Sequence, residues 1–315
     1  MNIVITGGGG FLGSRLARKL VSKDKNAYIT LFDAAFGAEV PGARAVKGDI
    51  ADPASLGEVV KGEIDTVFHL AAVVSGAAEA DFDLGMRVNL EGTKNLLERC
   101  RKLPRPPKVV FSSSVAAFGG DLPPELDDST TPTPQTSYGT QKVMGEYLIA
   151  DYSRKGYIDG RSLRLPTIVV RAGRPNAAAS SFASAIIREP LNGVPLECPV
   201  GPQTGIWLLS PRRVVDAFIH AAELPASAWP SARVVNLPGI TATVDEMLKA
   251  LERVAGEKVK ARVSFKPDAR IEAIVRTWPV RFRTPRALAM GFKPDADAQT
   301  LIRDYIEDEN IKVKA

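Results

Sequence analysis

Short apolar stretches rich in β-branched residues alternate with longer stretches of helical apolar spacing through the first half of the chain. Residues 2–6 and 28–32 have the composition of buried parallel strands, and residues 11–20 between them have the apolar periodicity of a helix. The alternation continues, with strands expected at 44–46, 66–70, 108–112 and 160–165 and helices at 53–61, 81–101 and 140–152. This order predicts an α/β fold, a Rossmann doubly wound parallel sheet with right-handed crossovers.

The pattern changes beyond residue 170. Residues 173–181 are rich in Gly, Pro, Asn, Ala and Ser, which is typical of a loop, and we expect this loop to cap the ligand-binding cleft. Residues 214–224 and 234–237 resemble a late helix and a late strand that return to the sheet. We therefore predict an NAD-binding Rossmann domain at 1–170, rejoined by 212–238, and a smaller C-terminal substrate-binding lobe formed by 171–211 and 239–315.

Three glycines separate the first strand from the first helix, in the pattern Gly-x-x-Gly-x-x-Gly. Gly7, Gly10 and Gly13 permit a tight turn, close approach of the backbone to a pyrophosphate, and packing of the helix against the strand. The helix that opens with Phe11 and Leu12 offers free N–H groups and a partial positive charge to the phosphates. The segment therefore predicts a dinucleotide site.

Asp33 ends the second strand, 20 residues beyond Gly13. A carboxylate at this position accepts hydrogen bonds from the adenosine ribose hydroxyls and repels a 2′-phosphate. The residues that follow, Asp33-Ala-Ala-Phe-Gly, include no Arg or Lys that would bind such a phosphate. The sequence therefore predicts NAD rather than NADP as the cofactor.

Tyr138 and Lys142 stand four residues apart in a predicted helix, so their side chains share a face. A nearby ammonium favours the phenolate form and lowers the pKa of a tyrosine, which would make Tyr138 a proton acceptor near neutral pH. The spacing alone is common by chance, and the simplest alternative is a pair of surface residues on a helix. The glycine loop and the triplet Ser112-Ser113-Ser114 favour the catalytic interpretation.

Composition narrows the class of protein. The 315 residues are 45% hydrophobic and 24% charged, as expected for a globular chain with one large α/β domain and a smaller lobe. The net charge of +5 is dispersed, and the dense basic stretch 281–286 favours a solvated edge over a nucleic-acid site. The two cysteines and two histidines have no metal-ligand spacing, so we expect reduced thiols and no metal. Without a membrane-spanning window or room for a signal peptide before a strand at residue 2, we expect a cytoplasmic protein that binds neither membrane nor nucleic acid.

Six motifs occur in the order found in one family: Thr6-Gly-Gly-x-Gly-Phe-Leu-Gly13, Gly48-Asp-Ile50, His69-Leu-Ala-Ala72, Asn89-x-x-Gly-Thr93, Ser112-Ser-Ser114 and Tyr138-x-x-x-Lys142. The chain thus resembles the extended short-chain dehydrogenase/reductase family, of the NAD-dependent epimerase/dehydratase type, over nearly its whole length. Each motif alone is weak, but their combination is highly specific. The resemblance implies the Rossmann fold and an NAD-dependent enzyme.

The resemblance implies Ser114, Tyr138 and Lys142 as the catalytic residues. The following pair Phe118-Gly119 selects Ser114, whose hydroxyl would bind the substrate oxygen; for the two preceding serines a strand-end backbone contact is the simpler interpretation. Lys142 would also hold the nicotinamide ribose. The expected cofactor-binding residues, with the adenine contacts at positions 49 and 50, are Gly7, Gly10, Phe11, Leu12, Gly13, Asp33, Asp49, Ile50, Leu70, Ala71, Ala72, Asn89, Ser112, Tyr138, Lys142, Pro166 and Ile168.

The substrate is indicated by a missing arginine. Nucleotide-sugar enzymes of this family usually carry Arg-Asp-(Phe/Tyr)-(Val/Ile) before the late helix, and that Arg grips the diphosphate; the equivalent stretch here begins at Ile206. Segments 133–142, 175–184 and 210–212 resemble a sugar-acid branch of the family, which oxidises the C2 hydroxyl of a four-carbon aldonic acid with NAD. The resemblance implies D-erythronate as the substrate and the 2-keto acid as the product, with Tyr138 accepting the hydroxyl proton.

A carboxylate and several hydroxyls need hydrogen-bond donors. Arg174 or Arg188 is expected to pair bidentately with the carboxylate, although an exposed loop charge fits either residue equally well. Trp207 is expected to fill the interface between the lobes rather than to touch the substrate. The other expected substrate-binding residues are Ser75, Ser114, Tyr138, Asn176 and Ser180, with turn and helix-cap roles competing for the last two.

Two other functions remain open at this point. A nucleotide-sugar epimerase or dehydratase would use the same Tyr and Lys with a retained NAD, whereas a non-enzymatic NAD-sensing or scaffold protein would not need them. The helix that carries Lys142 also presents Val143, Tyr147 and Leu148, more apolar surface than one cofactor-facing edge needs. The resemblance implies that two such helices pair across a twofold axis in a homodimer.

Overall fold

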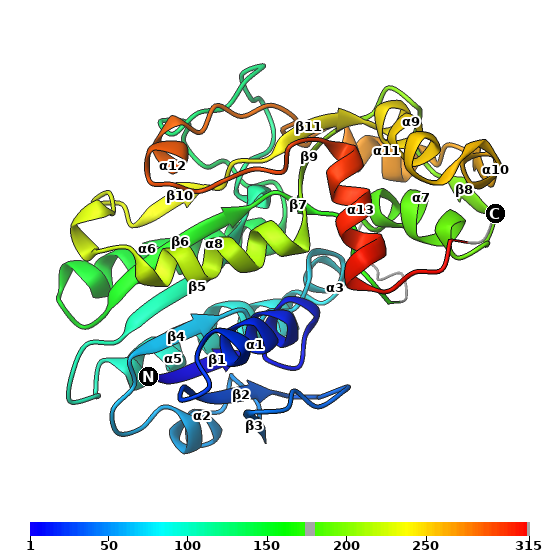
Figure 1. Cartoon of the computed structure of the whole chain (residues 1–315). Helices are drawn as coiled ribbons and strands as arrows, with labels where there is room; N and C mark the ends of the chain where they lie inside the picture. The colour runs from blue at the N-terminus through cyan, green and yellow to red at the C-terminus, as the bar shows by residue number, and fades with distance from the viewer. Residues whose placement is uncertain (174–179, 314–315) are drawn as a thin grey trace. The chain divides into compact units, whose positions relative to one another are not determined.

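The computed structural model describes residues 1–173 and 180–313, and the chain divides into two compact units (Figure 1). Unit 1 comprises 1–117, 134–164 and 215–236, and unit 2 comprises 118–133, 165–214 and 237–315. Unit 2 therefore includes 118–133, a segment that the sequence analysis placed in the Rossmann domain. Among the described residues, no helix is both long and apolar enough to cross a membrane.

Unit 1 is built on a seven-stranded sheet in the order β10-β6-β5-β4-β1-β2-β3. Most residues of the interior strands are buried because both faces of the sheet are covered by helices (Figure 1). The parallel pairings of β1 with β2 and β4, and of β6 with β10, confirm the predicted doubly wound sheet and the late strand that returns to it. The strands are β1 Asn2–Thr6, β2 Tyr28–Asp33, β3 Ala43–Lys47, β4 Thr66–His69, β5 Lys108–Ser114, β6 Asp159–Leu165 and β10 Val234–Asn236.

The longer helices of unit 1 bury apolar residues against this sheet. Leu56, Leu97 and Ile149 are fully buried in a core that also contains Val4 and Phe111 of the sheet. The helical segments are α1 Phe11–Lys23, α2 Pro53–Val59, α3 Ser75–Ala80, α4 Phe82–Gly85, η1 Met86–Glu91, α5 Gly92–Cys100, η2 Val115–Ala117, α6 Ser137–Arg154, α8 Pro211–Glu223 and η3 Ala226–Ala228. The chain passes from unit 2 into unit 1 within α8.

Two helices differ from the sequence-based expectation. The single helix expected at 81–101 is divided, because η1 is a π-helical segment whose wider turn shifts the faces of α4 and α5 relative to each other. Helix α6 begins at Ser137 rather than at 140, because Thr136 caps it by accepting a hydrogen bond from Gly139 N at 3.1 Å. Tyr138 therefore lies in the first turn of α6.

Unit 2 contains two small sheets and its own core. The three-stranded sheet has the order β11-β9-β7, and β8 pairs with β12. Ile206 and Leu208 of β9 pack with Met247, Leu251 and Ile302. The strands are β7 Thr167–Ile168, β8 Leu196–Cys198, β9 Gly205–Leu209, β11 Ile240–Thr243 and β12 Val263–Phe265, and the helices are α7 Ser181–Leu191, α9 Val244–Ala255, α10 Glu257–Lys260, α11 Ala269–Val275, α12 Pro285–Ala289 and α13 Ala298–Asp308.

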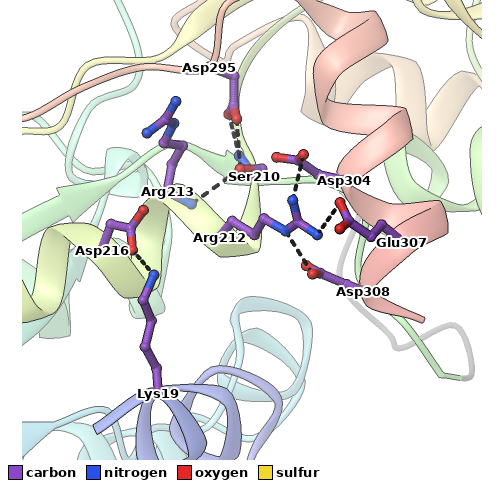
Figure 2. Close-up of polar contacts among 9 residues, drawn as sticks. All are labelled: Lys19, Ser210, Arg212, Arg213, Asp216, Asp295, Asp304, Glu307 and Asp308. Atoms are coloured by element: carbon purple, nitrogen blue, oxygen red, sulfur yellow. Dashed lines mark hydrogen bonds and ion pairs between the residues drawn. The ribbon is translucent and has the colours of Figure 1, made fainter. Parts of the chain in front are cut away.

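Arg212, in the first turn of α8, is bound to three acidic residues of α13 (Figure 2). Its Nε lies 2.7 Å from Asp308, and its two terminal nitrogens lie 2.9 Å from Asp304 and 2.8 Å from Glu307. A guanidinium suits this arrangement because its donors diverge in one plane. Arg212 therefore fastens the last helix of the chain to the start of α8.

Candidate active site

The glycine loop between β1 and α1 leaves space for a ligand and none for side chains. Gly7 has φ +73°, and a Cβ there would lie 2.6 Å from Ala71 N. A Cβ on Gly13 would lie 2.1 Å from Gly7 O, so α1 packs directly on the loop. No side chain of a described residue caps the first turn of α1, whose N–H groups are therefore available to phosphate oxygens. The loop fits a dinucleotide.

Asp33 is held in place at the carboxyl end of β2. Gly9 N donates to its Oδ2 at 3.0 Å and Ala35 N to its Oδ1 at 3.3 Å, which leaves lone pairs on both oxygens for further donors. The carboxylate is half-buried. Its placement beside the glycine loop fits the expected contact with ribose hydroxyls.

Asp49, an expected adenine contact, pairs with a cation that the sequence did not indicate. Ala51 N donates to Asp49 Oδ1 at 2.9 Å, and Arg87 lies 2.5 Å from Oδ2. Both contacts lower the pKa of Asp49, and the hydrogen bond from Ala51 N is the largest single cause. Ile50 is buried, and a Cβ on Gly92 would lie 2.8 Å from its Cγ2. The strand end is thus tied to η1 and α5.

Asn89 of η1 fixes the turn that follows β4. Its Oδ1 accepts from Val73 N at 2.8 Å, and its Nδ2 donates to Val73 O at 3.1 Å and to Gln141 Oε1 at 2.7 Å. These bonds join the Leu70–Val73 turn, an expected cofactor contact, to the helix that carries Lys142. A direct contact of Asn89 with the cofactor stays a prediction.

The serine triplet at the end of β5 serves three purposes. The Ser112 carbonyl accepts from Lys142 Nζ at 2.8 Å, and the buried Ser113 hydroxyl donates to Glu146, which also pairs with Arg164. Ser114 is half-buried, and its Oγ accepts from Ala116 N at 3.1 Å. The Ser112 carbonyl thus makes a backbone contact and the Ser113 hydroxyl a side-chain contact within the fold, and a contact of Ser112 with the cofactor stays a prediction.

Tyr138 and Lys142 lie together on one face of α6. Lys142 Nζ lies 5.5 Å from the centre of the Tyr138 ring and 4.9 Å from that of Phe111. The Lys142 side chain is almost completely buried, and this burial lowers its pKa to about 7, against a smaller opposing effect of Glu146. Half-buried Tyr138 therefore has a cationic partner whose charge depends on pH near neutrality.

Ser180 and Arg188 converge on Arg171, a residue that the sequence analysis did not single out. Arg171 donates to Ser180 Oγ at 3.2 Å, and Arg188 donates to Arg171 O at 2.8 Å. Arg188 is buried in α7 and pairs with Glu189 at 2.6 Å, so it is not an exposed loop charge. No local sequence pattern indicates Arg171, because its two hydrogen-bond partners lie 9 and 17 residues away along the chain.

The other expected site residues are distributed as follows. Ser75 is the half-buried first residue of α3. Arg174 and Asn176 lie outside the described residues. The remaining cofactor positions of the Rossmann domain lie in unit 1 at or after the carboxyl ends of parallel strands, whereas Pro166 and Ile168 belong to unit 2.

The apolar face of α6 differs from the expectation. Val143 is buried, and Leu148 packs against the core of unit 1. The exposed apolar residues there are Tyr147 and Met144, with Phe82 of α4. Exposed apolar residues are therefore present as expected, but Met144 and Phe82 take the place of Val143 and Leu148.

Comparison with known proteins decides the family. The model of the NAD dependent epimerase/dehydratase family matches residues 3–233. The chain belongs to this family. Two relatives in it are D-erythronate dehydrogenases: that of Cupriavidus necator is 52% identical over 99% of both chains, and that of Haemophilus influenzae is 46% identical over 98% of this chain and 99% of its own. A solved structure, the nucleoside-diphosphate-sugar epimerase from Agrobacterium tumefaciens, is 39% identical, with a TM-score of 0.92 over 98% of this chain and 94% of its own.

Membership of the NAD dependent epimerase/dehydratase family confirms the predicted resemblance and NAD as the cofactor. The protein is an NAD-dependent oxidoreductase with a Rossmann sheet. The Gly7–Gly13 loop, the fixed Asp33 carboxylate and the Tyr138–Lys142 pair are the features of unit 1 that fit this chemistry.

Proposed function

We propose that this protein oxidises the C2 hydroxyl of D-erythronate to 2-dehydro-D-erythronate with NAD. The observation that carries the substrate is the identity of 52% to a D-erythronate dehydrogenase over 99% of both chains. The buried Lys142 beside Tyr138 supports the reaction type. Ile206 also favours a small substrate, because it stands where nucleotide-sugar enzymes of the family carry a diphosphate-binding Arg.

Proton transfer is the part of the reaction that the side chains perform. Tyr138 accepts the C2 hydroxyl proton, and the ammonium form of Lys142 stabilises the negative charge that develops on the phenol. Ser114 Oγ accepts from Ala116 N, so its own hydrogen can be donated to the substrate oxygen. Bound NAD would supply the acceptor for the C2 hydride.

The cofactor would be held mainly by backbone groups of unit 1. The N–H groups at the start of α1 would bind the pyrophosphate, and Asp33 would accept from the adenosine ribose. Lys142 would donate to the nicotinamide ribose. Asp33 would also repel the 2′-phosphate of NADP, as expected for an NAD enzyme.

The carboxylate of the acid would be held by an arginine between 171 and 188. Arg174 and Arg188 are the candidates from the sequence, and Arg171 joins them because it contacts Ser180 and Arg188. Replacing each of these three arginines with Met in turn tests which of them binds the carboxylate. Loss of the carboxylate partner should raise KM for D-erythronate about tenfold or more, the effect of one charge-assisted hydrogen bond. Arg188→Met should also destabilise the protein, because Arg188 is buried and paired with Glu189.

A parallel assay tests the function. Wild-type protein is incubated with NAD and, separately, with D-erythronate, D-threonate, L-threonate or UDP-glucose, and NADH formation is followed. D-erythronate deuterated at C2 should transfer deuterium to the cofactor and show a slower rate. Tyr138→Phe is the matched inactive control. Turnover confined to UDP-glucose would overturn the proposed substrate.

The second candidate is a nucleotide-sugar epimerase or dehydratase. It is favoured by the 39% identity to a protein named a nucleoside-diphosphate-sugar epimerase. Ile206 counts against it, because this apolar side chain is buried in the core of unit 2 and cannot pair with a diphosphate. Protein purified with bound NAD, converting a nucleotide-sugar without net NADH formation, would establish this alternative.

We also propose a homodimer formed through α6. Phe82, Met144 and Tyr147 are exposed, by 58%, 38% and 67%, on α4 and α6. Phe82 and Met144 line a groove of about 420 Å³ together with Met86 and Pro134. Exposed aromatic and Met side chains of this kind are enriched at subunit contacts, and a twofold axis would cover them on both copies.

A further inference from the structure

Glu146 lies one turn of α6 beyond Lys142, and both side chains are almost completely buried. Residues four apart on a helix share a face, so the two side chains point to the same side of α6. Lys142 Nζ donates to the Ser112 carbonyl at 2.8 Å, and the Ser113 hydroxyl donates to Glu146. The ammonium and the carboxylate therefore reach consecutive residues of β5.

Helix α6 packs closely against β5 at this point. A Cβ on Gly145 would lie 2.8 Å from Cζ of Phe111, so the absence of a side chain there lets the helix approach the strand. Lys142 Nζ lies 4.9 Å from the centre of the same Phe111 ring. Charges buried in this way interact more strongly than charges in water, because the surrounding medium screens them less.

The Glu146 carboxylate is held in one position by Arg164 of β6. Arg164 Nε donates to Oε1 at 2.8 Å, and Nη2 donates to Oε2 at 2.6 Å. The Ser113 hydroxyl also donates to Oε1, and Arg164 Nη1 donates to Asn236 of β10 at 3.4 Å. A bidentate guanidinium and a hydroxyl suit the carboxylate form. All these residues belong to unit 1.

Titratable and charged groups approach Lys142 from several elements. Among the described residues they are Tyr138 and Glu146 of α6, His69 of β4, and Arg164 of β6 through its pair with Glu146. Burial lowers the pKa of His69 to about 3, so this ring is neutral near neutral pH. Burial also lowers the pKa of Lys142, and Glu146 opposes that effect. Glu146 is thus a group that favours the ammonium form of Lys142.

We propose that Glu146 is a positioning residue for the reaction, the buried counter-ion that keeps the Lys142 side chain an ammonium beside Tyr138. The proposal rests on the proposed function, in which this ammonium stabilises the charge that develops on the phenol, and adds one residue to it. Glu146 acts through Lys142. Arg164 and Ser113 hold the carboxylate in place for this purpose.

Glu146→Gln tests the role of the charge, because it retains the shape of the side chain. The pKa of Lys142 can be followed by NMR in protein whose lysines carry ¹³C at Cε, with Lys142→Met to identify the signal. In Glu146→Gln this pKa should fall by about one unit or more, the usual effect of losing a nearby opposite charge. Asp151→Asn is the matched control and should leave the Lys142 pKa unchanged, because it removes an exposed carboxylate from the same helix.

A second variant guards against misfolding, since Glu146→Gln leaves the buried Arg164 without its carboxylate. Glu146→Gln combined with Arg164→Met removes both buried charges. It should still lower the Lys142 pKa, but by less, because the repulsion between guanidinium and ammonium is lost as well. Glu146→Asp retains the negative charge and should restore most of the wild-type value. An unchanged Lys142 pKa in a folded variant that lacks the carboxylate would overturn the proposal.

The pH dependence of turnover distinguishes positioning from a purely structural role. For a Lys142 pKa lowered by one unit from about 7, the fraction of ammonium falls about tenfold at pH 8 and only about twofold at pH 6. The kcat of Glu146→Gln with NAD and D-erythronate should fall in the same proportions. A loss of equal size at both pH values would mean that Glu146 serves the fold alone, and would also overturn the proposal.

The NMR titration needs no substrate, so it separates this proposal from the proposed function. A lowered Lys142 pKa in Glu146→Gln, in a protein that does not oxidise D-erythronate, would support the counter-ion and count against the substrate. Turnover of D-erythronate by the wild type, with the same Lys142 pKa in the wild type and in Glu146→Gln, would support the proposed function and reject the role of Glu146.

Discussion

Replacing Lys142 with Met should change how the stability of the protein depends on pH. Lys142 is almost completely buried, and desolvation lowers its pKa from 10.5 to about 7. Below about pH 7 the folded protein therefore contains a buried ammonium, which destabilises it. Met has a similar length and no charge, so Lys142→Met removes this effect and retains most of the packing.

The sign and size of the effect follow from proton linkage. Between about pH 7 and pH 10.5 the unfolded chain binds the Lys142 proton and the folded protein does not, so wild-type stability rises with pH. One pH unit corresponds to about 1.4 kcal/mol, and the full displacement to roughly 5 kcal/mol. Because the folded protein is half-protonated at pH 7, the stability of the wild type relative to Lys142→Met should rise by roughly 2 kcal/mol between pH 7 and pH 9. The Ser112 carbonyl, left without its donor in the variant, adds a constant that does not depend on pH.

Urea unfolding of the cofactor-free proteins at pH 6, 7, 8 and 9 measures this difference. Lys155→Met, at the exposed end of α6, is the matched control and should show the same small difference at each pH. The free energy of unfolding of the wild type, relative to that of Lys142→Met, should rise only above about pH 7 and should be nearly constant below it. A difference that is flat from pH 6 to pH 9 would refute the buried-ammonium argument.

Four further predictions follow from the site and the fold. Tyr138→Phe should lose more than about tenfold in kcat, at least 1.4 kcal/mol, with unchanged NAD affinity by calorimetry; a smaller loss would remove Tyr138 as proton acceptor. Wild-type protein should prefer NAD to NADP in kcat/KM, and Asp33→Ala should reduce this preference; equal use of both cofactors by the wild type would contradict the role of Asp33. Met144→Glu with Tyr147→Glu should convert a dimer to monomer by light scattering, whereas a monomeric wild type at micromolar concentration would refute the dimer. Arg212→Met should lower the free energy of unfolding by about 1–3 kcal/mol, because it leaves three carboxylates of α13 without their partner; an unchanged urea midpoint would show that the cluster contributes nothing.

The alternation of apolar strands and amphipathic helices was enough to predict the sheet of unit 1. Strands such as β1 and β4 are short, rich in β-branched or apolar residues, and bounded by loops, so a local pattern identifies them. The π-helical segment Met86–Glu91 could not be predicted in this way. It interrupts a continuous helical pattern, and the contacts of Asn89 with Val73 and Gln141, which lie 16 and 52 residues away, are absent from any local window.

The residues of the candidate site also form two groups, those that a local sequence pattern predicts and those that it does not. Gly7, Asp33 and the Tyr138–Lys142 pair belong to motifs whose spacing reflects local geometry, a turn, a strand end and a helix face. Arg171 and the Arg87–Asp49 pair depend on chain segments that meet only after folding. Charge and composition alone could not distinguish these arginines from solvated ones, because their partners are distant in sequence.

The hydrogen bonds of His69 explain why Lys142, rather than this histidine, should govern behaviour near neutral pH. His69 is completely buried, and desolvation, with a smaller effect of Lys142, lowers its pKa to about 3. Thr93 Oγ1 donates to Asn89 O at 2.6 Å, so it must accept from His69 Nε2 at 2.8 Å. The ring then carries its proton on Nε2, and Nδ1 accepts from Thr6 Oγ1 at 2.8 Å. A neutral ring satisfies both hydroxyls and joins the end of β1, just before the glycine loop, to α5, whereas a protonated ring would present a second N–H to Thr6 and leave the Thr6 hydroxyl without its acceptor.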